Sequence, residues 1–264
     1  LGVAEIYAIG RIVSDDFNFP SMVAVSGADY TAPVQVLLGN YPAQFGRGLG
    51  VVAKLLDAKS SLSLQLHLPE GDVNAKPEMW VALKPKARAV MGFKGVVDRD
   101  TLKQQLEAGQ TASLNSVSME SGVAYDIKGG LAHAVGAGSY VYEVSMSPKD
   151  MSKATKSFMD RAIFDDEEPK DPRPGKDFTT MKEPQKKAVL DVLEQSGMLR
   201  AATPEDYIAP KPKAPVVTDG ESRGELTIEK PGFVVLTYTV KPGHNLAVEM
   251  LQLDTGAPTV FVEK

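Results

Sequence analysis

The chain has 264 residues, of which 43% are hydrophobic, and its formal net charge at pH 7 is −5. It is long enough to bury a sizeable core, and its acidic balance argues against nucleic acid or an anionic membrane as a partner, because both attract clustered Lys and Arg. The sequence has no cysteine, which excludes thiolate metal sites, and no apolar run approaches the roughly 20 residues that span a bilayer. Because its first residues carry no charged segment followed by a long apolar one, we expect a cytoplasmic protein.

Short alternating or β-branched stretches recur between Gly, Pro, Asn and Asp residues along much of the chain. This pattern is typical of a β-sandwich or a small barrel. We predict strands over residues 21–25, 61–68, 79–83, 139–144, 233–240 and 248–253.

Three other stretches have apolar residues near helical spacing. The first is Phe45–Ala58. The second, Asp100–Glu107, starts with a capping residue and ends before Gly109, and the third, Glu183–Gln195, is amphipathic and precedes Gly197. We predict a helix in each stretch.

Composition divides the chain into three parts. The first part, residues 1–145, is rich in predicted strands. Residues 146–214 are rich in Lys, Asp, Glu and Pro, and we interpret them as a helical or loop-rich insertion. Residues 215–264 then form a C-terminal β segment that we expect to pack on the first part or to extend it.

The predicted strand over residues 61–68 carries the first candidate site residues. Alternate side chains of a strand face the same way, so Gln65 and His67 can point together into one cavity. The opposite layer then receives the leucines of the same strand, which are Leu64, Leu66 and Leu68.

The scarce metal-binding side chains follow one another in an ordered series. His67 and His133 are two of the three histidines of the chain, and Glu78 lies between them. Two imidazoles, one carboxylate and the amide oxygen of Gln65 form a nitrogen and oxygen ligand set that suits zinc or another divalent transition metal. Each histidine alone is also explained as a satisfied core residue, and Glu78 as the ion-pair partner of Lys76.

The spacing of Gly122, Lys128, Gly130 and His133 resembles the second motif of the cupin superfamily, in which a proline stands at the position of Lys128. The resemblance implies a mainly β fold, a cupin-like β-sandwich or jelly roll with helical insertions. In this interpretation residues 1–145 form the metal-binding cupin-like domain.

Several segments, in the same order, resemble type I phosphomannose isomerases over about Lys54–Val144. The segments are Lys54–Lys59, Leu62–His67, Lys76–Trp80, Gly92–Lys94, His133–Gly138 and Tyr142–Glu143. The resemblance implies one divalent metal ion per chain, usually zinc, and its ligands are the four residues already proposed from their chemistry: Gln65, His67, Glu78 and His133.

The resemblance also implies catalytic and substrate-binding roles. It places Lys76, Glu143 and, through a looser alignment, Arg161 in catalysis, and Lys54 and Ser63 where the substrate phosphate is held. From the residues alone, Lys76 and Glu143 are also explained as a cross-strand ion pair. Lys54 and Arg161 are also explained as solvated charges on helices, and Ser63 as an ordinary strand residue. Trp80, which follows the metal-binding segment, is expected to be a core residue.

These inferences predict a metal-dependent aldose–ketose isomerase that interconverts mannose 6-phosphate and fructose 6-phosphate through an enediolate. Its partner is then a small sugar phosphate, and the sequence does not determine its oligomeric state. Two alternatives remain open. One is a non-catalytic sugar-binding or regulatory cupin that kept the metal site, and the other is a cupin isomerase that acts on glucose 6-phosphate.

Overall fold

The structure is a computed structural model. It describes residues 53–72, 75–145 and 178–210 and Lys230 together with their side chains, and it describes the backbone of further strands outside these ranges. All predicted site residues except Arg161 lie within these ranges. In the part of the chain that the structure describes, no helix is long and apolar enough to cross a membrane.

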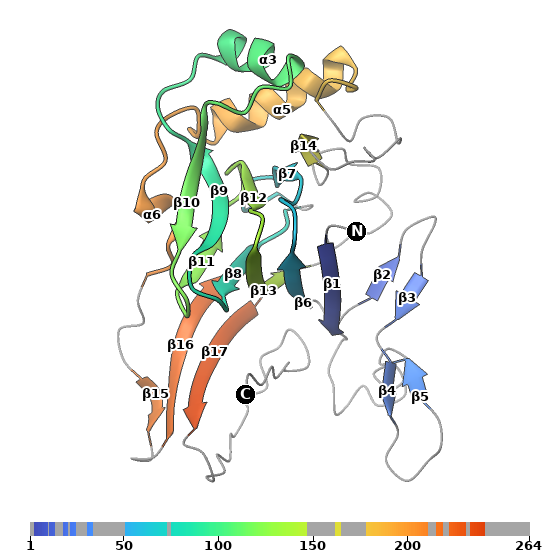
Figure 1. Cartoon of the computed structure of the whole chain (residues 1–264), viewed down its shortest axis with the longest axis vertical. Helices are drawn as coiled ribbons and strands as arrows, with labels where there is room; N and C mark the ends of the chain where they lie inside the picture. The colour runs from blue at the N-terminus through green and yellow to red at the C-terminus, as the bar shows by residue number, and fades with distance from the viewer. Residues whose placement is uncertain are drawn as a thin grey trace.

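Two antiparallel sheets of five strands each pack face to face and form the centre of the protein (Figure 1). The first sheet has the strand order β1-β6-β13-β8-β11, and its strands are β1 (Val3–Ile9), β6 (Val51–Ala58), β13 (Ser139–Met146), β8 (Glu78–Ala82) and β11 (Ala124–Ile127). The second sheet has the order β10-β9-β12-β7-β14, and its strands are β10 (Leu114–Met119), β9 (Ala87–Phe93), β12 (His133–Val135), β7 (Leu64–Gln65) and β14 (Ala162–Phe164).

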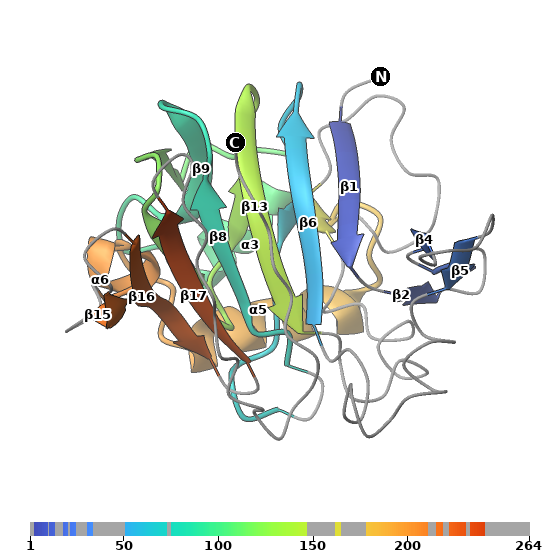
Figure 2. The same ribbon diagram turned by 90° about the horizontal axis from the view of Figure 1, so that it is seen from below.

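Smaller elements surround the two sheets. The helices are α3 (Arg99–Glu107), α5 (Glu183–Gln195) and the short α6 (Pro204–Tyr207). A third sheet joins β15 (Pro215–Thr218), β16 (Ser222–Lys230) and β17 (Phe233–Val240), and two hairpins pair β2 (Arg11–Val13) with β3 (Asn18–Pro20) and β4 (Met22–Ala24) with β5 (Thr31–Pro33). Figure 2 shows β16 and β17 on the side of the first sheet that faces away from α3 and α5.

The core consists of separate layers on the two faces of each sheet. The space between the sheets is filled by side chains from both, among them Leu56, Met91 and Val141. The outer face of the second sheet packs against α3 and α5 through the apolar residues of those helices and the leucines around β7. Leu64, Leu66 and Leu68 therefore face the helical layer, away from the site, as the strand pattern predicted.

The prediction of a mainly β, cupin-like sandwich with helical insertions is confirmed. Strands β4, β8, β13 and β17 lie where strands were predicted, and α5 has the predicted bounds. Helix α3 is also confirmed, but its N-cap is Asp98, whose carboxylate accepts hydrogen bonds from the backbone N–H groups of Asp100 and Thr101. The predicted strand over residues 248–253 lies outside the described residues.

The predicted helix over Phe45–Ala58 is wrong for the part that the structure describes. Val51–Ala58 is strand β6, which pairs with β1 on one side and β13 on the other. Both faces of this central strand are covered, with Leu56 packed between the sheets and Ala53 on the opposite face. Apolar residues therefore stand at neighbouring positions without strand alternation, and such a run is easily mistaken for a helix.

Helix α5 belongs to the predicted insertion of residues 146–214, and it shares one apolar cluster with the second sheet. Phe178 and Leu190 lie in the same cluster as Leu66 and Phe93. The division into three domains remains a prediction, but this helix is part of the layer that covers the sandwich.

Candidate metal centre

The proposed ligands His67, Glu78 and His133 come together between the two sheets. The atoms with which they can bind a cation all lie within 4.8 Å of one another. His67 Nε2 and Glu78 Oε2 are 3.0 Å apart, and the two imidazole ring centroids are separated by 4.6 Å. The three residues are at most 2% exposed, so the cluster lies in the interior and is unlike the acidic groups that occur on many protein surfaces.

The two sheets supply these side chains from opposite sides. Glu78 begins β8 of the first sheet, whereas His133 begins β12 of the second. In the pairing of β12 with β7, His133 stands directly opposite Gln65. Directly paired residues point to the same face of a sheet, so the Gln65 side chain is on the face that carries His133. Its amide nitrogen donates to Ser63 Oγ at 3.3 Å.

A glycine pair places the segment that contains His67 against the loop that leads to His133. The Gly130 N–H donates to the His67 carbonyl at 2.9 Å, and Gly130 has a φ of +84° that favours glycine. A Cβ atom on Gly129 would lie 2.3 Å from the Leu68 carbonyl oxygen. The close approach of these two backbones therefore requires glycine, and it positions both histidines.

His133 presents a lone pair to the cluster. Its Nδ1 donates to the Leu131 carbonyl at 2.8 Å, because a carbonyl oxygen can only accept. The buried Nε2 accepts no hydrogen bond from the described residues. Burial, together with the neighbouring His67, lowers the pKa of His133 to about 3. The ring is therefore neutral near pH 7, with an unprotonated Nε2, and this is the form in which histidine binds metals.

Glu78 is held in its ionised form. Burial by itself would raise the pKa of its carboxyl group, but the Lys76 ammonium and the hydrogen bond with His67 outweigh burial and hold the pKa well below its usual range. Lys76 Nζ is 2.8 Å from Glu78 Oε2, and the indole N–H of Trp80 donates to Glu78 Oε1 at 2.5 Å. A carboxylate and a neutral imidazole nitrogen that accepts no hydrogen bond from the described residues are suited to a divalent transition metal.

A second buried carboxylate lies beside the cluster. Glu143 in β13 is 5% exposed, and its Oε1 is 3.3 Å from Lys54 Nζ and 3.8 Å from Lys76 Nζ. The Ser145 hydroxyl donates to the same oxygen at 3.2 Å. Lys76 therefore lies between the two carboxylates and links Glu143 to the candidate metal centre.

The strand register explains why Lys54 is close to Glu143. Lys54 in β6 stands opposite Glu143 in β13, and Glu143 stands opposite Trp80 in β8. The alternative that Lys54 is a solvated helix residue is therefore wrong. The ion pair expected between Lys76 and Glu143 is present at 3.8 Å, although Lys76 lies in the segment that precedes β8. Lys54 contacts the same carboxylate oxygen of Glu143 at 3.3 Å.

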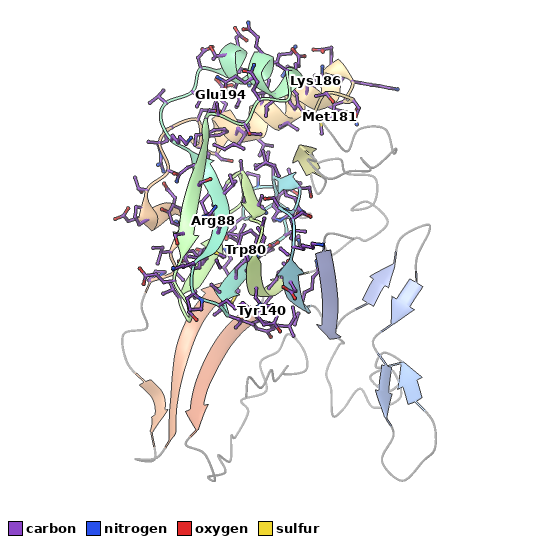
Figure 3. The ribbon with its side chains drawn as sticks, in the orientation of Figure 1. Trp80, Arg88, Tyr140, Met181, Lys186 and Glu194 are labelled. Carbon is purple, nitrogen blue, oxygen red and sulfur yellow. The ribbon has the colours of Figure 1, made fainter. Side chains whose placement is uncertain are left out.

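Most of the predicted site residues lie in one region. The structure brings the candidate ligands, Lys54, Lys76 and Glu143 together, and it places Ser63 against Gln65. Arg161 lies outside the described residues. Sequence reasoning treated Trp80 as a core residue alone. It is buried among the core residues (Figure 3), and its indole N–H also donates to Glu78. Its position two residues after a strand carboxylate would have placed both side chains on one face.

Comparison with known proteins supports this fold from an independent direction. No protein-family model matches the sequence, and no curated protein matches it. Solved structures do match. The mannose 6-phosphate isomerase from Bacillus subtilis superposes with a TM-score of 0.57 at 14% identity, over 91% of this chain and 80% of that one.

Two further solved structures share this fold. A candidate mannosephosphate isomerase from Archaeoglobus fulgidus gives a TM-score of 0.54 at 18% identity over 85% of this chain. The match spans 66% of that protein, slightly less than two thirds of its length. A mutant of phosphomannose isomerase from Salmonella typhimurium gives 0.52 at 13% identity, over 84% of this chain and 71% of that one. At such identities the likeness shows that the fold is shared.

Proposed function

We propose that the protein is a metal-dependent aldose–ketose isomerase that interconverts mannose 6-phosphate and fructose 6-phosphate. The observation that carries the proposal is the buried cluster of His67, Glu78 and His133 with Lys76 and Glu143 directly beside it. The fold shared with mannose 6-phosphate isomerases supports it. A cytoplasmic location, expected from the sequence, remains a prediction.

The proposed ligands of the metal are His67, Glu78 and His133, with the amide oxygen of Gln65 as the fourth. Zinc suits this ligand set because it accepts imidazole and carboxylate ligands together. The bound metal supplies a Lewis acid that polarises the sugar oxygens and fixes their orientation. Burial of the cluster keeps competing water away from these oxygens.

The isomerisation moves a proton between C1 and C2 of the open-chain sugar. Glu143 is our candidate for the group that removes and returns this proton, because it is a buried carboxylate next to the cluster. Lys76 carries a positive charge between the two carboxylates. We assign it to the stabilisation of the negative charge that develops on the enediolate.

Lys54 and Ser63 are our candidates for phosphate binding. The Lys54 ammonium contacts a carboxylate oxygen in this structure, and the same ammonium can bind a phosphate oxygen. Its side chain is 16% exposed and that of Lys76 is 17% exposed, so both reach from the interior toward solvent. Arg161 remains the candidate for the catalytic arginine on the strength of the sequence resemblance alone.

The test is to mix zinc-loaded protein with fructose 6-phosphate and to follow the formation of mannose 6-phosphate. We expect turnover that disappears when a chelator removes the metal and returns when zinc is added back. Glucose 6-phosphate is measured at the same concentration, and a preference for it would assign the protein to a different sugar-phosphate isomerisation. Binding of the sugar phosphate without turnover at saturating metal would instead support the non-catalytic alternative.

A further inference from the structure

Trp80 lies on β8, the strand that begins with Glu78, and it contacts two of the candidate ligands. Its indole N–H donates to Glu78 Oε1 at 2.5 Å, and its ring meets the His133 ring edge-on with centroids 5.5 Å apart. It is 3% exposed and lies on the face between the sheets (Figure 3). The side chain therefore forms part of the wall of the candidate metal centre.

We infer that Trp80 is a positioning residue of the metal centre, which holds Glu78 Oε1 so that Oε2 is the carboxylate oxygen offered to the cation. This inference rests on the proposed metal-dependent function. The two oxygens of Glu78 are already divided in this way. Oε1 faces the indole, whereas Oε2 faces His67 Nε2 at 3.0 Å and Lys76 Nζ at 2.8 Å.

The packing around Trp80 holds its indole ring in the orientation that contacts Glu78. Trp80 is flanked in register by Glu143 of β13 and Tyr125 of β11, and it packs among buried residues of both sheets. Indole has a single polar group, which can only donate. A buried N–H without an acceptor is costly, so the contact with Glu78 fixes the ring and the carboxylate together.

The consequence concerns the strength and selectivity of metal binding. Oε1 faces the fixed indole donor, whereas Oε2 faces His67, another candidate ligand, so Glu78 is arranged to offer one oxygen to a metal, which suits zinc with its few ligands. Calcium takes six to eight oxygen ligands and often uses both oxygens of a carboxylate. Partners that hydrogen-bond to metal ligands are commonly worth about 10-fold to 100-fold in metal affinity. Removal of the indole N–H should therefore weaken zinc binding more than calcium binding.

The chain allows this N–H to be removed with almost no change of shape. Trp80 is the one tryptophan of the sequence, so incorporation of a benzothiophene analogue of tryptophan, in which sulfur replaces the N–H, alters this position alone. Trp80→Phe is the genetic counterpart. Zinc affinity is measured for each protein by competition with a chromophoric chelator. We expect a loss of about 10-fold or more for both relative to the wild type.

Tyr125→Phe is the matched control. Tyr125 stands opposite Trp80 in the pairing of β11 with β8, and its hydroxyl accepts a hydrogen bond from the Glu120 N–H at 2.8 Å. The substitution removes one polar atom from a buried aromatic residue that is paired with Trp80 in the same sheet, and it does not alter the contact with Glu78. It should lower the unfolding temperature and leave zinc affinity unchanged.

The fluorescence of Trp80 supplies a second measurement on the unaltered protein. Zinc added to the metal-free wild type should change the emission of this tryptophan, and His67→Ala should abolish that change. If the wild type binds zinc and the analogue-containing protein binds it equally well, the inference about Trp80 is overturned while the metal centre stands. If the wild type neither binds zinc nor changes its emission, the proposed function falls and the inference falls with it.

Discussion

The ion pairs between the sheets differ in burial from those between α3 and α5, although basic and acidic side chains form both. On the helices, Arg99 contacts Asp191 at 2.6 Å and Glu194 at 2.7 Å, and these side chains are 25%, 30% and 59% exposed. Between the sheets, Glu78 and Glu143 have side chains that are 2% and 6% exposed. Exposed pairs contribute little to stability because water screens them, whereas buried charges are costly unless a specific partner or ligand compensates for them. The comparison teaches that burial, more than the number of charges, marks the functional region.

Removal of an imidazole from the metal centre should have the largest effect. We expect His133→Ala to lose both metal and isomerase activity, because its Nε2 is a buried nitrogen without a partner among the described residues. Elemental analysis of purified protein and the isomerase assay measure the two losses. A variant that keeps its zinc would contradict the assignment of this histidine as a ligand.

Lys76→Met should separate catalysis from metal binding. The substitution removes the positive charge between Glu78 and Glu143 but leaves all proposed ligands in place. We expect zinc content near that of the wild type and a fall in kcat of about 100-fold or more. Lys103→Met, which removes an ion pair with Glu107 on α3, is the control and should leave kcat unchanged. Full activity of Lys76→Met would exclude a catalytic role for this lysine.

Acid should destabilise the metal-free protein before its carboxylates titrate. Burial lowers the pKa of His133 from 6.5 to about 3, so between these values the unfolded chain binds a proton that the folded chain does not. Stability should therefore fall as the pH drops below about 6.5, by up to about 1.4 kcal/mol per pH unit from this group. Chemical denaturation of the wild type and His133→Gln across this range measures the difference. The free energy of unfolding of the variant should fall less steeply with decreasing pH than that of the wild type. Equal slopes for the two proteins would contradict the prediction.

Lys230 provides the smallest test, since it is a buried cation outside the metal centre. It ends β16 and pairs with Glu70 and Asp126, and its side chain is 3% exposed. Lys230→Met should reduce the free energy of unfolding by about 1–3 kcal/mol, less than for a wholly buried pair because Glu70 is 39% exposed. Arg99→Ala on the helices should cost about 1 kcal/mol or less. Urea denaturation compares the two, and a larger loss for Arg99→Ala would invert the comparison.

The candidate site could be predicted from the sequence to a greater extent than the local structure around it. Histidines and carboxylates are scarce enough in apolar stretches for His67, Glu78 and His133 to stand out, and the resemblance to a known family put them in order. The strand β6 was missed because a strand covered on both faces loses its alternation. The contact of Trp80 with Glu78 was missed because burial alone already explains a tryptophan. Pairing between strands distant in the sequence, such as Lys54 opposite Glu143, depends on a register that one sequence does not fix.

The glycine turn before His133 also connects the metal centre to the end of α5. A Cβ atom on Gly130 would lie 2.1 Å from Ser196 Oγ, so the residue that caps α5 packs directly on the turn whose N–H holds the His67 carbonyl. The final shape of the turn and the docked position of α5 therefore depend on one shared contact. Metal capture should accordingly be a late event in the maturation of this protein, and the rate of zinc uptake during refolding would report when its distant segments have assembled.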